Sequence, residues 1–220
     1  MKSNLLTAAV AAALLVSAPF AASAQQAQAT ARVAPAPQSS ASKLVLDSST
    51  RILTTLEKRR AEFRASPAAL NAYVDSEFNR LFDREYAARL VLGLHGRGAS
   101  DADVKLFADA LADNLLARYG TALLDFDGQL KVRIKSEAAL PGGRGVKVSS
   151  EFLRASGEPV PVDYLMRNTG GQWKLFDVMI EGISYVQTFK NQFDAPLRTK
   201  SIAQVAADLR AGRLQAGGNN

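Results

Sequence analysis

The 220-residue chain contains no cysteine and a single histidine, His95. Without cysteine it can form no disulfide, no thiolate nucleophile and no thiolate metal site. His95 stands among the glycines Gly93, Gly96 and Gly98 in a predicted turn, and it has no second histidine to join as a metal ligand or catalytic partner. We therefore expect neither a metal nor a catalytic histidine, and stability must come from a hydrophobic core.

Long hydrophobic runs are also missing. The longest apolar stretch, Leu5–Val16, has about a dozen residues, whereas a membrane-spanning helix needs about twenty. Lys2 precedes this stretch and Ala22-Ser23-Ala24 follows it, which is the pattern of a cleaved secretory signal. We predict a signal peptide over 1–24 and a disordered leader over 25–42, because the leader has almost no large apolar residue to bury.

The charge balance favours anionic surfaces as partners. The formal net charge is +6, and in an exported protein moderate basicity fits an anionic membrane surface or an acidic partner better than a nucleic acid. The glycine-rich segment 93–98 follows a predicted helix rather than a strand, so it lacks the geometry of a phosphate-binding loop. We therefore expect no cofactor.

Hydrophobic periodicity divides the rest of the chain into helices, strands and helices again. Apolar residues at helical spacing predict helices over 43–63, 67–92 (continuing or restarting near its end) and 100–119. Alternating patterns then predict strands over 130–135, 146–152, 160–167 and 173–180. Helical spacing returns over 183–197 and 201–214. This order predicts an α+β fold, a curved four-stranded antiparallel sheet packed by helices, in one domain over 43–214 with a disordered tail over 215–220.

The fourth predicted strand is apolar on both faces. Strict alternation places Phe176 with Val178 and Ile180 on one face and Leu175 on the other, so the strand should be central or covered on both sides. Asp177 falls inside this strand, where a buried carboxylate needs a partner. A structural pairing and a binding role both remain open for it.

Large apolar side chains are more numerous on the inner faces than a small core requires. The aromatic residues expected to point inward are Phe78, Phe82, Phe107, Tyr119, Tyr164, Phe176, Phe189 and Phe193. They could form a solid core or line a pocket for an apolar ligand. The opposite strand face carries Lys131, Arg133, Lys135 and Lys147, either as a solvated face or as a docking surface.

Two blocks of sequence resemble a known family. The first comprises 86–93 (YAARLVLG), 107–124 and 127–129, and the second is 173–184 (WKLFDVMIEGIS) followed by Phe189, Gln192-Phe193 and Leu209. Both blocks are similar to the MlaC family, also called the toluene tolerance family, the periplasmic phospholipid-binding component of the Mla (maintenance of lipid asymmetry) ABC transport system. The resemblance extends over about 43–213, most of the predicted domain.

The resemblance implies a periplasmic carrier that is not an enzyme. Such a carrier would exchange glycerophospholipid between an outer-membrane Mla lipoprotein complex and an inner-membrane Mla transporter that contains a lipid-binding ring protein, and so maintain outer-membrane lipid asymmetry. No catalytic residue is expected. From their apolar faces, the residues we expect to line the acyl-chain pocket are Tyr119, Leu123, Val132, Val148, Tyr164, Phe176, Val178 and Val186.

The sequence is also compatible with three alternatives to a glycerophospholipid carrier. A small periplasmic enzyme with a nuclear-transport-factor-like cone shape would share the sheet and cavity and would use Asp177. An envelope adaptor with a solid core would bind no lipid. Within the family, a hopanoid-like lipid is an alternative to a glycerophospholipid.

Overall fold

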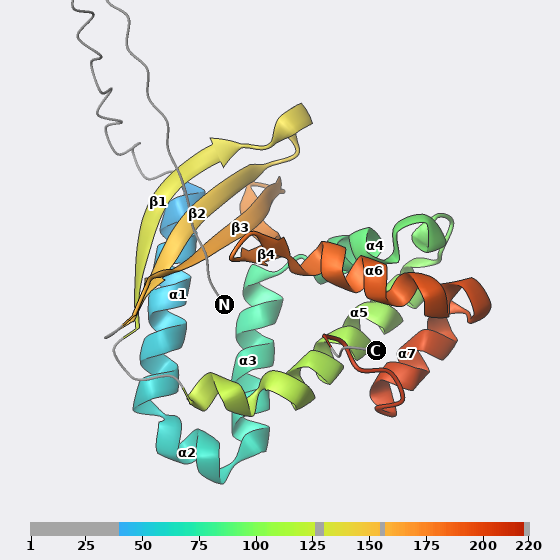
Figure 1. Ribbon diagram of the computed structural model, residues 1–220, viewed down its shortest axis with the longest axis horizontal. Coiled ribbons are helices and arrows are strands. Elements are labelled where there is room, and N and C mark those ends of the chain that lie inside the picture. The colour runs from blue at the N-terminus through green and yellow to red at the C-terminus, as the bar shows by residue number, and fades with distance from the viewer. Residues whose placement is uncertain (1–39, 126–129, 155–156, 218–220) are drawn as a thin grey trace, which may run out of the picture. The chain divides into compact units, whose positions relative to one another are not determined.

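The computed structural model describes residues 40–125, 130–154 and 157–217 (Figure 1). The predicted signal peptide and most of the predicted leader lie outside these residues, although the first helix begins at Ser40, inside the predicted leader. The helices and strands are α1 (Ser40–Lys58), α2 (Arg60–Ala65), α3 (Pro67–Leu81), α4 (Arg84–Leu92), η1 (Gly93–Gly96), α5 (Asp101–Tyr119), η2 (Thr121–Leu124), β1 (Lys131–Ala139), η3 (Pro141–Gly143), β2 (Val146–Leu153), β3 (Val160–Thr169), β4 (Gln172–Ile180), β5 (Ile183–Ser184), α6 (Tyr185–Thr199) and α7 (Ile202–Arg210).

The predicted α+β fold with an antiparallel sheet is confirmed. The strands pair in chain order, β1-β2-β3-β4-β5, and every pair is antiparallel. The fifth strand was not predicted: Ile183 and Ser184, expected to begin a helix, instead pair with Ile180 and Met179. Ser184 is also the N-cap of α6, because its hydroxyl accepts a hydrogen bond from the Gln187 N–H, and the helix starts at Tyr185.

A β-bulge in β4 changes which way its side chains point. Leu165 pairs with Asp177 and the next residue, Met166, pairs with Leu175, so Phe176 is an extra residue on β4. A bulge of this kind interrupts the alternation of faces along a strand. The prediction that Leu175 and Val178 face opposite ways is therefore wrong: both line one cavity, while the Phe176 ring packs edge-on against Tyr86 of α4.

Beyond its pairing with β5, the outer edge of β4 is covered by the segment between α3 and α4. Phe82 forms a parallel bridge with Leu175, and the Asp83 N–H donates to the Leu175 carbonyl at 2.7 Å. The Asp83 carboxylate in turn accepts from the Tyr86 N–H and caps α4. This pairing explains why the long predicted helix over 67–92 stops and restarts at this point.

Helices α4 to α7 lie beside the sheet (Figure 1) and share a hydrophobic core. Phe107 of α5 and Phe193 of α6 meet edge to face with ring centroids 5.5 Å apart, and both are almost fully buried. Val205 and Leu209 of α7 complete this core, so α7 packs along α5. These helices line none of the described wall of the main cavity, presented below, but α4, α5 and α6 supply most of the wall of a smaller one.

Acidic neighbours pair with three of the four basic residues on the basic strand face. Glu151 on β2 pairs with both Arg133 (ion pair at 2.5 Å) and Lys135 (3.0 Å) of β1, and Lys147 pairs with Asp163 of β3 at 3.2 Å. The side-chain hydrogen bonds from Arg133 and Lys135 hold the pKa of the Glu151 carboxyl below its usual range. Of the two readings of this face, the pairing supports a solvated surface.

Among the described residues, no helix has both the length and the apolar character that crossing a bilayer demands.

Candidate functional site

An apolar cavity of about 530 Å³ lies between the inner face of the sheet and the helices α1 and α3. This volume falls within the range of about 300–1,000 Å³ typical of small-molecule sites. Its described wall is made by Leu44, Val45, Ser48, Ser49, Ile52, Leu53, Leu56, Tyr73, Val74, Glu77, Phe78, Leu81, Phe82, Ala122, Leu123, Leu130, Phe152, Tyr164, Met166, Leu175 and Val178. We call it the main cavity.

The main cavity lies between the two ends of α1, where the buried apolar residues of this helix are found. Near its start, Ala41 and Val45 pack against Val148 and Met166 of the sheet. Near its end, Leu56 packs in a second cluster around Phe63 and Leu70. Between Val45 and Leu56 the helix runs for about 16 Å, and the residues of this stretch that face inward line the cavity instead of filling it.

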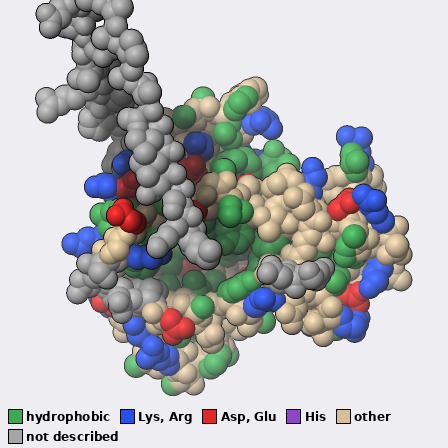
Figure 2. All heavy atoms as spheres, viewed as in Figure 1, with side chains coloured by type: hydrophobic (Ala, Val, Ile, Leu, Met, Phe, Trp, Pro, Cys, Tyr) green, Lys and Arg blue, Asp and Glu red, His purple; other side chains and the backbone are tan. Residues whose placement is uncertain are grey.

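Two smaller cavities adjoin the main one. One of about 270 Å³ lies between α4, α5, α6 and β4, and one of about 170 Å³ lies between α3 and α5. Phe78 belongs to the walls of all three cavities, and Phe82 and Val178 belong to both the main cavity and the 270 Å³ cavity. Figure 2 shows hydrophobic side chains gathered in a hollow between the strands and the helices on the face in view.

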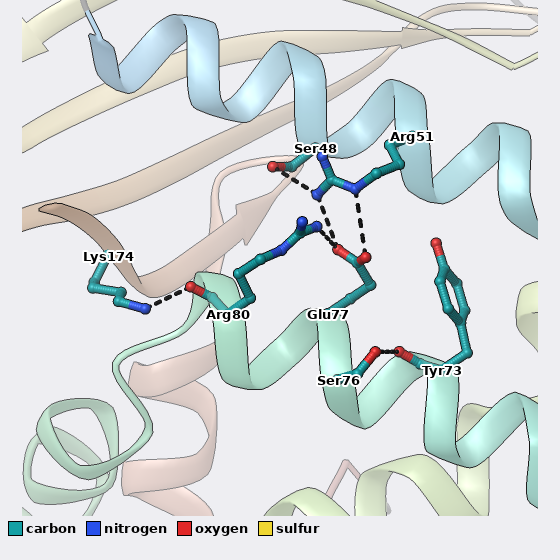
Figure 3. Close-up of polar contacts among 7 residues, drawn as sticks. All are labelled: Ser48, Arg51, Tyr73, Ser76, Glu77, Arg80 and Lys174. Carbon is teal, nitrogen blue, oxygen red and sulfur yellow. Dashed lines mark hydrogen bonds and ion pairs between the residues drawn. The ribbon is translucent and has the colours of Figure 1, made fainter.

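Few side chains in the described wall of the main cavity are polar. The one charged residue among them, Glu77, forms ion pairs with two arginines. Glu77 of α3 accepts from Arg51 of α1 at 3.0 Å and from Arg80 one turn along, and Arg51 also donates to Ser48 at 3.2 Å (Figure 3). Lys174 of β4 donates to the Arg80 carbonyl at 2.6 Å. This network ties α1, α3 and β4 together at the cavity.

The two tyrosines of the main cavity are held in their neutral form. Burial raises the pKa of Tyr164, and hydrogen bonds with Ser49 and Ser150 offset this in part. Burial likewise raises the pKa of Tyr73. Because Glu77 is paired with two guanidinium groups and the tyrosines stay uncharged, the wall presents a nearly neutral, apolar surface to a ligand.

Five of the eight residues nominated from the sequence line at least one of these cavities. Leu123, Tyr164 and Val178 line the main cavity, Val178 and Val186 line the 270 Å³ cavity, and Tyr119 and Leu123 line the 170 Å³ cavity.

The other three nominees lie outside the described walls of these cavities. Val148 is fully buried in the cluster between α1 and the sheet, and Phe176 packs on Tyr86. Val132 lines a separate groove of about 370 Å³ beside Thr50 and Glu57.

Sequence reasoning missed the helical half of the wall. Helices α1 and α3 supply more residues of the described wall than the strands do, among them Ile52, Leu53 and Tyr73. Their spacing at three and four residues predicts a buried helix face. It does not show whether that face packs against other residues or lines a cavity.

Asp177 and His95 both have structural partners. Asp177 is buried, and its carboxylate accepts from the Ser184 hydroxyl at 2.6 Å and from the Val186 N–H at 3.0 Å, at the start of α6. His95 lies 3.0 Å from Asp194, and hydrogen bonds from His95 and Arg198 keep the pKa of the Asp194 carboxyl low. Over the described part of the chain, no group of three or more histidine or acidic side chains could hold a metal ion.

Comparison with known proteins agrees with this geometry. The sequence model described as MlaC protein matches residues 47–211. The toluene tolerance protein Ttg2D of Pseudomonas putida is 25% identical over 78% of this chain and 80% of its own length. The intermembrane phospholipid transport system binding protein MlaC of Haemophilus influenzae is 23% identical over 67% of this chain and 71% of its own.

A solved structure shares the fold. The phospholipid-binding protein of Ralstonia solanacearum, determined in complex with a phospholipid, superimposes with a TM-score of 0.69 at 22% identity. The match covers 79% of this chain and 98% of that one. At this identity the likeness establishes the architecture, and the ligand belongs to the Ralstonia protein.

Proposed function

The chain belongs to the MlaC family, and from this we propose that it is a periplasmic carrier that binds a phospholipid by its acyl chains and moves it between two membranes. The observation that carries the proposal is the main cavity, about 530 Å³ of space between the sheet and α1 and α3 with an almost wholly apolar wall. An apolar void of this size suits an apolar occupant, because water finds few hydrogen-bond partners there.

The physical basis of the carrier is burial of hydrocarbon. Each methylene moved from water into an apolar site contributes about 0.8 kcal/mol, so a free lipid crosses an aqueous space only at great cost. We place the acyl chains against Leu123, Tyr164 and Val178 in the main cavity and against Val186 in the 270 Å³ cavity, with the headgroup at the mouth. Affinity then comes from the tails, with little selection among headgroups.

The proposal extends to compartment and partners. A cleaved signal over 1–24 would deliver the chain to the periplasm, where it would exchange glycerophospholipid with an outer-membrane Mla lipoprotein complex and with the lipid-binding ring protein of an inner-membrane Mla transporter. Its role would be to maintain the lipid asymmetry of the outer membrane. The relatives named for toluene tolerance and phospholipid transport support this assignment.

The carrier catalyses no reaction in this proposal. The rival cone-fold enzyme would use Asp177, but that carboxylate already accepts hydrogen bonds from Ser184 and Val186. The rival adaptor would have a solid core, and the main cavity argues against that. A hopanoid-like ligand would fit the same apolar wall and is separated from a glycerophospholipid by the test below.

The test is to express the full chain in a Gram-negative host, purify the exported protein without detergent, and record native mass spectra followed by lipid extraction. We expect about one phospholipid per protein, released as glycerophospholipid in the extract. A protein that arrives empty and takes no lipid from phospholipid vesicles would overturn the proposal, and a bound hopanoid would correct the ligand class.

A further inference from the structure

Two aromatic rings stand where the cavities meet. Phe78 of α3 lines all three cavities, and Phe82, one helical turn later, lines the main cavity and the 270 Å³ cavity. Their rings are stacked, with centroids 4.4 Å apart and planes inclined by 13°. Val178 of β4 borders the same two cavities, so the stacked pair and this strand residue lie between them.

The pair is held from both sides. Phe82 is fixed to the sheet because it bridges Leu175 at the edge of β4. The Phe78 ring also lies 5.5 Å from the Arg84 guanidinium carbon, a cation–π contact. Arg84 is itself anchored, since it donates to the Asn79 side chain at 2.6 Å and lies 3.3 Å from the Asp75 carboxylate. These contacts hold the stacked Phe78 and Phe82 rings in place between the cavities.

We propose that Phe78 and Phe82 divide the interior into two compartments of unequal size, each for one hydrocarbon chain, and that Phe78 determines which lipids fit. The main cavity takes the longer chain. The cavity of about 270 Å³, walled by apolar residues such as Val91, Leu111 and Phe189, takes the second chain and limits its length. This inference rests on the proposed function and assigns it a substrate class, lipids whose two chains differ in the room they require.

The maximum length of the second chain can be measured by exchanging lipid between vesicles and the protein. A methylene that fits in the protein leaves one hydrocarbon environment for another, so lengthening a chain that fits leaves the partition between vesicle and protein unchanged. A methylene that does not fit must leave the membrane for water or force the protein open. Each such methylene should lower occupancy about fourfold, the equivalent of about 0.8 kcal/mol.

The experiment loads the purified protein from vesicles made of pairs of phosphatidylcholines. One chain is the same long acyl group throughout, and the second chain is lengthened stepwise, with a short-second-chain lipid as the common reference. Native mass spectrometry gives the ratio of the two lipids bound. For the wild type we expect a constant ratio up to a limiting length and a fall of about fourfold per added methylene beyond it.

Matched variants test the role of Phe78. Phe78→Ala and the milder Phe78→Leu open the divider, so the fall should move to longer second chains, further for Ala than for Leu. Phe193→Leu is the control, because Phe193 is a buried phenylalanine of the helical core that lies outside the described walls of the three cavities. It should keep the wild-type limit. If Phe78→Ala does not accumulate, the comparison of the two leucine variants decides the matter.

The outcomes separate this inference from the proposed function. A wild type that shows no fall across the range, or a Phe78→Leu limit equal to that of the wild type, overturns the divider while lipid binding stands. A shift of the same size in Phe193→Leu also overturns it, since general loosening would then explain the change. A wild type that takes no phosphatidylcholine overturns both proposals.

Discussion

Asp177 joins the sheet to the first turn of α6. The carboxylate on β4 is buried and receives one hydrogen bond from the Ser184 side chain and one from the Val186 backbone. A buried acceptor that satisfies a backbone donor at a helix start contributes to stability because both partners would otherwise lie unpaired away from water. The same contacts explain why a carboxylate sits in an apolar strand.

Asp177→Asn should lower stability. The amide can accept from one donor but presents an N–H to the other, so we expect the free energy of unfolding in urea to fall by about 1–3 kcal/mol. Asp47→Asn, at an exposed i,i+4 pair on α1, is the control and should change it by less than about 0.5 kcal/mol. Unchanged stability in Asp177→Asn would contradict the structural role, and loss of lipid from a folded variant would reopen a binding role.

At the residue level, strand alternation predicts which side chains point inward. Tyr164 and Val178 were nominated from alternation, and both line the main cavity. Leu175 was assigned to the wrong face because the bulge at Phe176 shifts the register against β3, and no residue type in that segment announces a bulge. Val148 shows a second limit of this prediction. Alternation predicts that its side chain points inward, but it does not predict whether a helix packs directly on it, as α1 does.

At the scale of elements, α1 and α3 form the helical wall of the main cavity. The Arg51–Glu77 ion pair links them, and Arg80 and Ser48 extend the link on either side (Figure 3). Glu77 is mostly buried and Arg51 about one third exposed, so the pair is only partly screened by solvent. We infer that this link slows separation of α1 from α3.

Glu77→Gln should therefore speed lipid exchange. Removing the charge weakens the link by about 1 kcal/mol or less, and transfer of a fluorescent phospholipid from the loaded protein to acceptor vesicles should become a few-fold faster. Asp47→Asn removes an ion pair within α1 alone and should keep the wild-type rate. Equal rates for the wild type and Glu77→Gln would show that another step limits exchange.

The element order followed from periodicity, whereas the breaks between elements did not. The change from helical to alternating spacing predicted the sheet and its flanking helices. The stop at Phe82 depends on pairing with Leu175, about ninety residues away in sequence, and such a tertiary contact leaves no local signal. The separation of α2 from α1 at Arg59 was missed as well.

At the scale of the whole folded unit, two kinds of interior lie side by side. Helices α4 to α7 enclose a packed core in which Val104, Phe107 and Val205 are fully buried, apart from the 270 Å³ cavity that α4, α5 and α6 share with β4. The sheet, α1 and α3 enclose the main cavity, where wall residues such as Ile52 and Phe78 remain only half-buried. Fewer apolar contacts hold the second half, so it should open locally at lower free energy than the first.

Lipid loading should consequently protect one half of the unit more than the other. In hydrogen exchange measured by mass spectrometry at short labelling times, amides of α1 and α3 should exchange readily in lipid-stripped protein and become protected on loading. Helix α7, which lies outside the described walls of the three cavities, should be protected in both states. Short times are required because slow exchange through global unfolding is suppressed everywhere by ligand binding, by about 2.7 kcal/mol at a lipid concentration one hundred times Kd. Equal protection of all helices at short times would contradict a division into solid and hollow halves, and it would place the flexibility needed for lipid entry elsewhere in the chain.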